Sequence, residues 1–378
     1  MMQFMSGTRI VAGEGSLDTL PTEVQQLGDK VLVVTDSGVG ATGLLDLIVT
    51  PLKQAGIEVV VYDSVKGNPT EVHVEESLDL YRKANASVII GIGGGSPLDT
   101  SKAVSLLATN GGRVSDFEGA TAYKVAPAPL IAVPTTTGTG SEVTKGAVIS
   151  NVETGAKMVI ASTQLYPRVA LLDPRSVAAL PGTICVATGM DALTHAIEGF
   201  VANGASPMSD ALCLHATRLI AESFRPAAAG RPDALYRMLV ASCVAGCGFH
   251  NAGLGLVHAL ANTAQNHFPL HHGTTCGVLL PHVMDYNVIA APGKFAQLAQ
   301  ALGADIDGLP DYEAARHSVS AVTQLMQDIG AANTLSSLGV SADKFGELAE
   351  EATGNFDWAP NPRRATIGDA KILYAAAL

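Results

Sequence analysis

Charged and aromatic residues are scarce in this chain of 378 residues. Only 15% of the residues are charged and 5% are aromatic, with a single tryptophan, whereas 47% are hydrophobic. Positive charge is the rarer sign, with 23 Lys and Arg against 35 Asp and Glu. Proteins that bind nucleic acid need clustered Lys and Arg to neutralise phosphates. The composition therefore argues against a nucleic-acid partner.

Long apolar segments are missing as well. No uninterrupted run reaches the roughly 18–20 residues that a membrane helix needs, and the first residues lack the basic start and apolar stretch of a signal peptide. We therefore expect a cytoplasmic protein without a membrane partner. The high apolar fraction and low charge favour a homodimer or a higher homo-oligomer with surface buried between subunits, although a large core also explains them.

Cysteine motifs are absent too. The five cysteines all lie after residue 180, and none forms a CxxC pair. Cys243 and Cys247 are four residues apart in an apolar helical stretch and so share a helix face. For this pair, packing is favoured over a redox or metal role.

The first half alternates β-branched runs with helical segments. The strands are predicted at VLVVTD (31–36), EVVVYD (58–63), ASVIIGIG (86–93) and LIAVP (130–134). Their nearly continuous apolar character is typical of a parallel sheet covered on both faces. After about residue 180, long helical patterns replace them. The sequence therefore predicts an α/β dinucleotide-binding domain (1–180) followed by an all-α domain (181–378).

Two glycine-rich turns follow predicted strands. GIGGGSPLDTSKA (91–103) opens a helix, and PTTTGTGSE (134–142) follows the next strand. Glycines let a backbone approach a pyrophosphate, and a helix N-terminus offers unpaired N–H groups. Such turns also serve tight packing, but two of them at the ends of two strands of one sheet favour a dinucleotide.

Asp36 ends the first strong strand. An acidic side chain there accepts hydrogen bonds from the adenosine ribose and repels a 2′-phosphate, which predicts NAD over NADP. The alternative interpretation is an Asp that caps a helix or turn.

Carboxylate and imidazole groups recur in the second half. Asp191 and His195 are four apart and project from one face of a helix, while His258 and His272 follow later. Such donors suit Fe(II) or Zn(II). Spacing by itself does not select which of the ten histidines converge, and packed core histidines are commoner than ligands.

Together these segments resemble the iron-containing (group III) alcohol dehydrogenases, the family of lactaldehyde reductase and 1,3-propanediol dehydrogenase. The resemblance covers nearly the whole chain. It is carried by VTD (34–36), GNPT (67–70), GGGSPLDTSKA (93–103), PTTTGTGSEVT (134–144), ATGMDALTHAIEGF (187–200), GFHNAGLGLVHALAN (248–262), HHG (271–273), LLPHVMDYN (279–287) and NPR (361–363).

The resemblance implies a dehydroquinate synthase-like fold with one divalent metal, most readily Fe(II) with Zn(II) as the alternative, and NAD. The implied metal ligands are Asp191, His195, His258 and His272. The implied cofactor contacts are Asp36, Asn68, Gly94, Gly95, Ser96, Asp99, Thr135, Thr136, Thr139 and Lys157.

Two positions depart from the family pattern. Where relatives often have a second histidine four residues after the GLVH histidine, this chain has Asn262, which cannot titrate and is a candidate residue of the substrate pocket. The proton must then leave through water, a ribose hydroxyl or another residue such as His267. The segment NFDWAPNPR (355–363) also places Trp358 ahead of NPR, close to the expected substrate pocket.

The function implied is hydride transfer between NAD(H) and a small alcohol, aldehyde or ketone at a metal ion. A maleylacetate-reductase-like enzyme without metal is an alternative, against which the four intact ligands count. A dehydroquinate-synthase-like lyase is a further alternative, but it needs cationic residues for a phosphorylated substrate and the second half is poor in Lys. A protein that only binds NAD has no need of a four-ligand site. The sequence does not identify the substrate.

Overall fold

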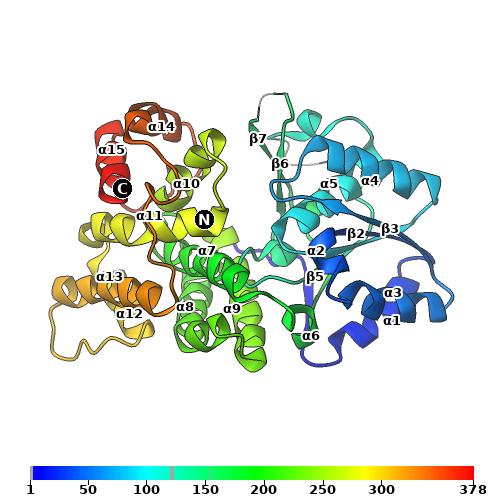
Figure 1. Cartoon of the computed structure of the whole chain (residues 1–378), viewed down its shortest axis with the longest axis horizontal. Helices are drawn as coiled ribbons and strands as arrows, with labels where there is room; N and C mark the ends of the chain where they lie inside the picture. Colours follow the sequence, from blue (N-terminus) through cyan, green and yellow to red (C-terminus); the bar gives the residue numbers. More distant parts are fainter. Residues whose placement is uncertain (1–2, 120–122, 154) are drawn as a thin grey trace. The chain divides into compact units, whose positions relative to one another are not determined.

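The computed structural model describes residues 3–119, 123–153 and 155–378. The chain forms two compact units. The sheet unit comprises residues 6–136 and 140–180, and the helical unit comprises residues 3–5, 137–139 and 181–378. Figure 1 shows the strands gathered in the first part of the chain and helices in the second.

A six-stranded parallel sheet is the centre of the sheet unit, with strand order β1-β8-β5-β4-β2-β3. Its strands are β1 (Arg9–Ala12), β2 (Lys30–Asp36), β3 (Glu58–Val65), β4 (Val88–Gly93), β5 (Leu130–Pro134) and β8 (Val169–Leu172). A separate antiparallel pair consists of β6 (Gly146–Ser150) and β7 (Lys157–Ala161). The four strands predicted from the sequence form β2, β3, β4 and β5.

Helices cover both faces of this sheet because alternate strand residues point to opposite sides. Leu32 and Val34 of β2 join a core with α4 and α5, whereas Val31 and Val33 join another core with α1 and α3. The helices of this unit are α1 (Leu20–Gln25), α2 (Ser37–Gly40), α3 (Leu44–Gln54), α4 (Glu71–Lys83), α5 (Gly95–Asn110) and α6 (Pro174–Val177).

The strand order reverses between β2 and β4, which are neighbours in the sheet. The chain leaves β2 toward α3 on one face and leaves β4 toward α5 on the opposite face. In open parallel sheets, such a reversal opens a crevice at the carboxyl ends of the two strands, and ligands bind there.

The helical unit is built around α7 (Gly182–Val201), which packs against α8, α9 and α11. Its other helices are α8 (Pro207–Ala228), α9 (Pro232–Ala252), α10 (Leu256–His267), α11 (His272–Asn287), α12 (Pro292–Ala301), α13 (Asp311–Asp328), α14 (Phe345–Ala352) and α15 (Ile367–Ala376). The predicted fold class, an α/β part followed by an all-α part, is confirmed.

Among the described residues, no single helix is both long and apolar enough to cross a membrane. The pair α9 and α10 reaches that length and composition only when joined, and the two helices are bent by 98° at the break between them.

Candidate functional site

Three of the segments predicted to bind the cofactor lie at the carboxyl ends of adjacent strands. Asp36 ends β2, the Gly94–Ser96 turn follows β4, and Thr135 and Thr136 follow β5. The last residues of β4 and β5 stand opposite each other, Gly93 against Pro134, and the Thr135 N–H donates to the Gly93 carbonyl at 3.0 Å. The sheet therefore brings these segments together at the strand-order reversal.

The turn between β4 and α5 requires glycine. Gly93 has φ 147°, and a Cβ there would stand 2.5 Å from Pro97 Cγ. The turn leads into the sixteen-residue helix α5, whose first N–H groups, on Gly95 and Ser96, have no acceptor within the helix. Beside it, Thr136 Oγ1 is buried without a hydrogen-bond partner among the described residues. The turn thus presents backbone donors to an anion.

Asp36 also caps a helix. Its Oδ1 accepts the Val39 N–H of α2 at 3.0 Å, so the alternative predicted from the sequence is realised. The other carboxylate oxygen, Oδ2, lies 3.3 Å from the position that a Cβ on Gly93 would take. The same carboxylate therefore caps α2 and lies beside the glycine turn.

The segment that contains Asn68 is hydrogen-bonded to the strand opposite Lys157. The Ser150 N–H donates to the Pro69 carbonyl at 2.7 Å, and Lys157 is the cross-strand partner of Ser150. Asn68, directly before Pro69, has a positive φ of 54°. The β6–β7 pair therefore holds the GNPT segment after β3, next to the strand that carries Asp36.

Two other predicted cofactor residues are placed differently. The Asp99 carboxylate accepts from Ser141 Oγ at 2.7 Å and from the Val148 N–H at 3.0 Å, so it fastens α5 to the segment leading into β6. Burial raises the pKa of this carboxyl group, against the opposing effect of Lys102. Thr139 lies in the short stretch 137–139 that belongs to the helical unit.

The four predicted metal ligands come from three helices of the helical unit. Asp191 and His195 lie on α7, His258 lies on α10, and His272 is the first residue of α11. Asp191, His195 and His258 are 4%, 6% and 2% exposed. A buried carboxylate among imidazoles needs a compensating partner.

The three imidazoles surround a single oxygen. The Nε2 atoms of His195, His258 and His272 lie 3.6, 3.6 and 3.4 Å from Asp191 Oδ1. A tetrahedral ion with bonds of about 2.0–2.2 Å separates its ligand atoms by about 3.3–3.6 Å. Asp191 Oδ1 and His258 Nε2 have no hydrogen-bond partner among the described residues. The donor spacing is that of a metal site.

Each histidine is held at its other ring nitrogen. His195 Nδ1 lies 3.2 Å from the Gly138 carbonyl, and His272 Nδ1 lies 2.9 Å from Gln265 Oε1. His258 Nδ1 lies 2.6 Å from Glu198 Oε2, whose second oxygen accepts the Val257 N–H at 2.7 Å. Because these oxygens accept a proton from Nδ1, the lone pair of each neutral ring is on Nε2 and faces Asp191.

A close helix contact places His272. A Cβ on Gly273 would stand 2.0 Å from the Ala187 carbonyl and 3.1 Å from Asp191 Cβ. Only a residue without a side chain lets the start of α11 approach α7 this closely. The glycine that follows the third histidine is therefore part of the site geometry.

The charges of the cluster shift its pKa values in opposite directions. Burial lowers the pKa of His195 to about 4. Burial would also lower that of His258, but the Asp191 and Glu198 carboxylates outweigh it and raise the pKa to about 10. Burial opposes ionisation of Asp191, yet the histidines hold its pKa well below the usual range. Without metal, His258 therefore holds a proton between two carboxylates.

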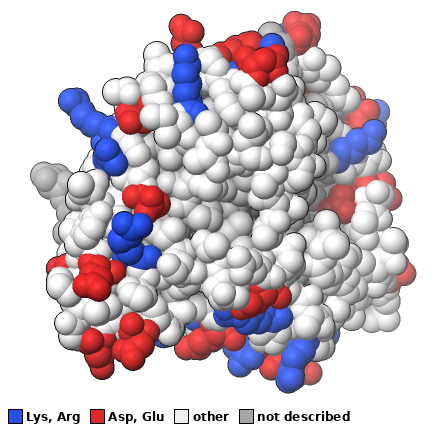
Figure 2. All heavy atoms as spheres, turned by 60° about the vertical axis from the view of Figure 1, so that its left-hand side comes forward, with Lys and Arg blue, Asp and Glu red and all other residues white. Residues whose placement is uncertain are grey.

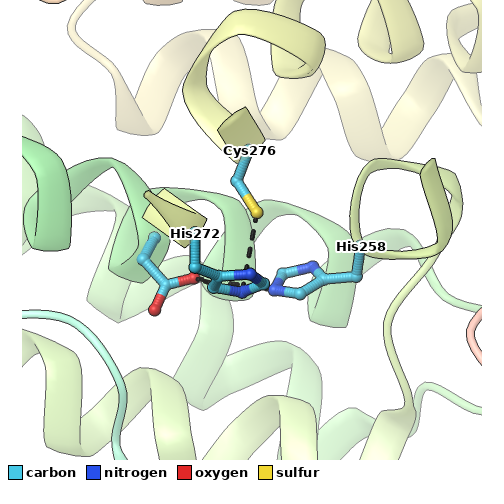
Figure 3. Close-up of side chains that lie close together, drawn as sticks. His258, His272 and Cys276 are labelled. Carbon is cyan, nitrogen blue, oxygen red and sulfur yellow. Dashed lines mark hydrogen bonds and ion pairs between the residues drawn. The ribbon is translucent and has the colours of Figure 1, made fainter. Parts of the chain in front are cut away.

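Cys276 also faces this cluster. Its Sγ lies 3.7 Å from His272 Nε2, and Figure 3 shows the sulfur directed at the His272 ring, with His258 beside it. The donor atoms of Asp191, His258, His272 and Cys276 all lie within 4.8 Å of one another, and His195 is not part of this group. Cys243 and Cys247 lie in α9, outside it.

Sequence reasoning did not single out several of these residues. Glu198 follows Asp191 and His195 at helical spacing, and Cys276 follows His272 by four residues, so helix periodicity carried a signal for both. No local signal pointed to Gln265 or Gly138. Nor did one point to Asp357, a carboxyl group that is 3% exposed and whose pKa burial raises to about 7.

The structure describes both residues at which the sequence departs from the family pattern, Asn262 and Trp358. Asn262 lies one turn after His258 on the same face of α10 and is partly buried, as is Trp358. His267, considered for the proton path, pairs with Glu351 instead, with Nε2 2.6 Å from Oε2.

Comparisons with known proteins agree with this geometry. A family model described as iron-containing alcohol dehydrogenase matches residues 7–174, and one described as the C-terminal part of the Fe-containing alcohol dehydrogenase family matches residues 185–378. The chain is 40% identical over 354 residues to the 1,3-propanediol dehydrogenase of Citrobacter freundii, which covers 93% of this chain and 92% of the relative.

Two further relatives extend over the full length. The NAD-dependent methanol dehydrogenase of Bacillus methanolicus is 35% identical over 381 residues, with 100% of both chains covered. A crystal structure of 1,3-propanediol oxidoreductase superposes with a TM-score of 0.98 at 37% identity, again over 100% of both chains. The chain belongs to the iron-containing alcohol dehydrogenase family. The predicted family and the prediction of an oxidoreductase are confirmed.

Proposed function

We propose that this protein catalyses the reversible oxidation of a small primary or secondary alcohol to its aldehyde or ketone, with NAD as the hydride carrier and one divalent ion, Fe(II) in preference to Zn(II). The observation that carries the proposal is the set of three Nε2 atoms around Asp191 Oδ1, an oxygen that has no hydrogen-bond partner among the described residues. When bound, such an ion supplies a Lewis acid that polarises the substrate oxygen.

Asp191, His195, His258 and His272 would hold the ion. Glu198, Gln265 and the Gly138 carbonyl fix the histidine rings, so the donors are already oriented. Asp191 would act as a metal donor and not as the base, because the histidines hold its pKa well below the usual range and so make the carboxylate a weak base.

The turns at the strand-order reversal would hold NAD, the cofactor of the NAD-dependent methanol dehydrogenase to which the chain is similar. Gly94, Gly95 and Ser96 would offer N–H groups to the pyrophosphate, and Asp36 would accept from the ribose and repel a 2′-phosphate. Asn68, Asp99, Thr135, Thr136, Thr139 and Lys157 complete the proposed cofactor contacts.

Proton release would not use position 262, because Asn262 has no titratable group, and His267 is engaged with Glu351. We infer that the proton leaves through water or a ribose hydroxyl. Asn262 would then shape the pocket by hydrogen bonding.

We also propose a homodimer or higher homo-oligomer in the cytoplasm. The low charge content of the chain supports a homo-oligomer. The central part of the face drawn in Figure 2 is also largely uncharged, and the charged side chains lie mostly toward its edge. Light scattering would measure the assembly, and a monomer at micromolar concentration would contradict it.

The test of the function is an assay of NADH formation with a panel of short alcohols, and of NADH consumption with the matching aldehydes, on Fe(II)-loaded protein. We expect net turnover in both directions and none after chelation. Full activity of metal-free protein would support the keto-acid reductase alternative, and substrate conversion without net NADH would support a lyase.

A further inference from the structure

Cys276 lies one helical turn after His272 on α11, on the same face of the helix. It is fully buried, at 0% exposure. Its Sγ lies 3.7 Å from His272 Nε2, the nitrogen that also faces Asp191 Oδ1 at 3.4 Å. The sulfur therefore stands next to the atoms proposed to bind metal, as Figure 3 shows.

The S–N distance is that of two donors to one ion. For a metal–sulfur bond of about 2.3 Å and a metal–nitrogen bond of about 2.05 Å, tetrahedral geometry separates the donors by about 3.6 Å. A weak S–H···N hydrogen bond would have a similar length, so the distance alone does not decide.

The second observation concerns the other donors of the same group. Asp191 Oδ1 and His258 Nε2 are buried without a hydrogen-bond partner among the described residues, and each of these two residues has a donor atom within 4.8 Å of Cys276 Sγ. These two atoms lie 3.6 Å apart, which is too far for a hydrogen bond, so a cluster arranged only for packing or hydrogen bonding does not account for them. They indicate a ligand that all four side chains share.

We propose that Cys276 is a metal ligand that replaces His195 when the site takes an ion that favours sulfur, such as Zn(II) or Co(II). The inference rests on the proposed metal site. Thiolate favours Zn(II), whereas imidazole and carboxylate also suit Fe(II). In the exchange the Cys276 thiol loses its proton to solvent, the sulfur–metal bond forms, and the bond from His195 breaks. The identity of the bound ion thus selects between two sets of four donors.

Cobalt(II) provides the test, because thiolate bound to it gives a sulfur-to-metal charge-transfer absorption that imidazole and carboxylate do not give. The metal-free protein is loaded with Co(II) alone, and bound cobalt is counted alongside the spectrum. Cys276→Ser removes the sulfur. Cys213→Ser is the matched control. Cys213 is equally buried, but it lies on α8 and packs against Gly199 of α7 and Gly248 of α9.

We expect the charge-transfer band in the wild type, in Cys213→Ser and in His195→Ala, and its loss in Cys276→Ser. Competition with a chelator should show that Cys276→Ser lowers Zn(II) affinity at least about tenfold more than Fe(II) affinity. If Cys276→Ser and Cys276→Ala bind no cobalt while Cys213→Ser does, the thiol is needed to hold the ion, which also supports the proposal.

A wild-type protein that binds one cobalt per chain without the band would overturn the inference and leave the proposed function intact. The same holds if the band persists in Cys276→Ser. Failure of the wild type to take up any divalent ion would instead defeat the proposed metal site itself, and this inference with it.

Discussion

The candidate nucleotide site of the sheet unit and the candidate metal site of the helical unit are built from different chemical groups. At the ends of β2, β4 and β5, the sheet unit offers mainly backbone: N–H groups at the start of α5 and a turn that depends on Gly93. In the helical unit, the donors are side chains from α7, α10 and α11, each fixed by a further group. The nucleotide part should therefore tolerate most side-chain changes, whereas the metal part should fail when a donor common to both proposed ligand sets, Asp191, His258 or His272, is lost.

Loss of a metal donor should give the largest effect. We expect His258→Ala to abolish Fe(II) binding and turnover, because the three remaining oxygen and nitrogen donors hold this ion poorly and lose its geometry. NAD affinity, measured by fluorescence titration, should change less than about twofold because the NAD turns belong to the sheet unit. An equal loss of NAD binding would break the comparison between the two parts.

Removing the charge of Glu198, the carboxylate that holds the far ring nitrogen of His258, should lower metal affinity less than the loss of a ligand does. Glu198→Gln should lower metal affinity about 10–100-fold, because Gln orients the His258 ring more weakly and adds no negative charge. Competition with a chelator measures the change. Glu222→Gln on the exposed side of α8 is the control and should have no effect.

The same variant should change how metal binding depends on pH. The raised pKa of His258 means that the metal-free protein holds a proton there below about pH 10, and the ion must displace it. Metal affinity should therefore fall by about tenfold for each unit that pH is lowered. In Glu198→Gln the His258 pKa drops toward its ordinary value, so the slope near neutral pH should flatten; an unchanged slope would contradict this account.

Removing one charge from the sheet-unit turn should shift cofactor preference without abolishing activity. Asp36→Asn keeps an oxygen to cap α2 but loses the charge that repels a 2′-phosphate. Binding of NADP relative to NAD should improve by about 1–3 kcal/mol. The ratio of kcat/KM with the two cofactors measures it, and Asp36→Gly shows what loss of the cap adds. A wild-type enzyme that prefers NADP would contradict the proposed contact between Asp36 and the ribose.

The smallest effect is expected at Asn262. Asn262→His places a group that titrates near neutral pH one turn from His258. The pH profile of kcat/KM should gain a limb at about pH 6–7 while metal content stays the same. Superimposable profiles at equal metal content would leave position 262 as a determinant of pocket shape alone.

The sequence predicted four of the six strands of the main sheet. β2, β4 and β5 are buried apolar runs, and β3, at one edge of the sheet, is a β-branched run; both kinds of run predict strands directly. β1 is short and mostly exposed, and β8 has four residues, so neither stands out before the sheet assembles around it. The β6–β7 pair was also missed; its alternation of buried and partly buried residues is a weaker signal than a continuous apolar run.

The candidate metal site was also only partly predictable from the sequence. The pair Asp191 and His195 follows from helix periodicity, but His258 and His272 come from other helices, and only the family resemblance joined them. Gly138 acts through a contact that depends on how the chain folds back on α7, and Gln265 acts across the connection between α10 and α11. No spacing in the sequence encodes such contacts.

The contact at Gly273 implies that the size of the metal site is set by the distance between two helix backbones. A single methyl group there would meet the Ala187 carbonyl and press α11 away from α7. His272 and Cys276, both on α11, would then move together relative to Asp191. Selectivity for ionic radius in the candidate metal site would thus depend on a residue that has no side-chain donor atom, and redesign of the site for a larger ion should begin at this backbone contact.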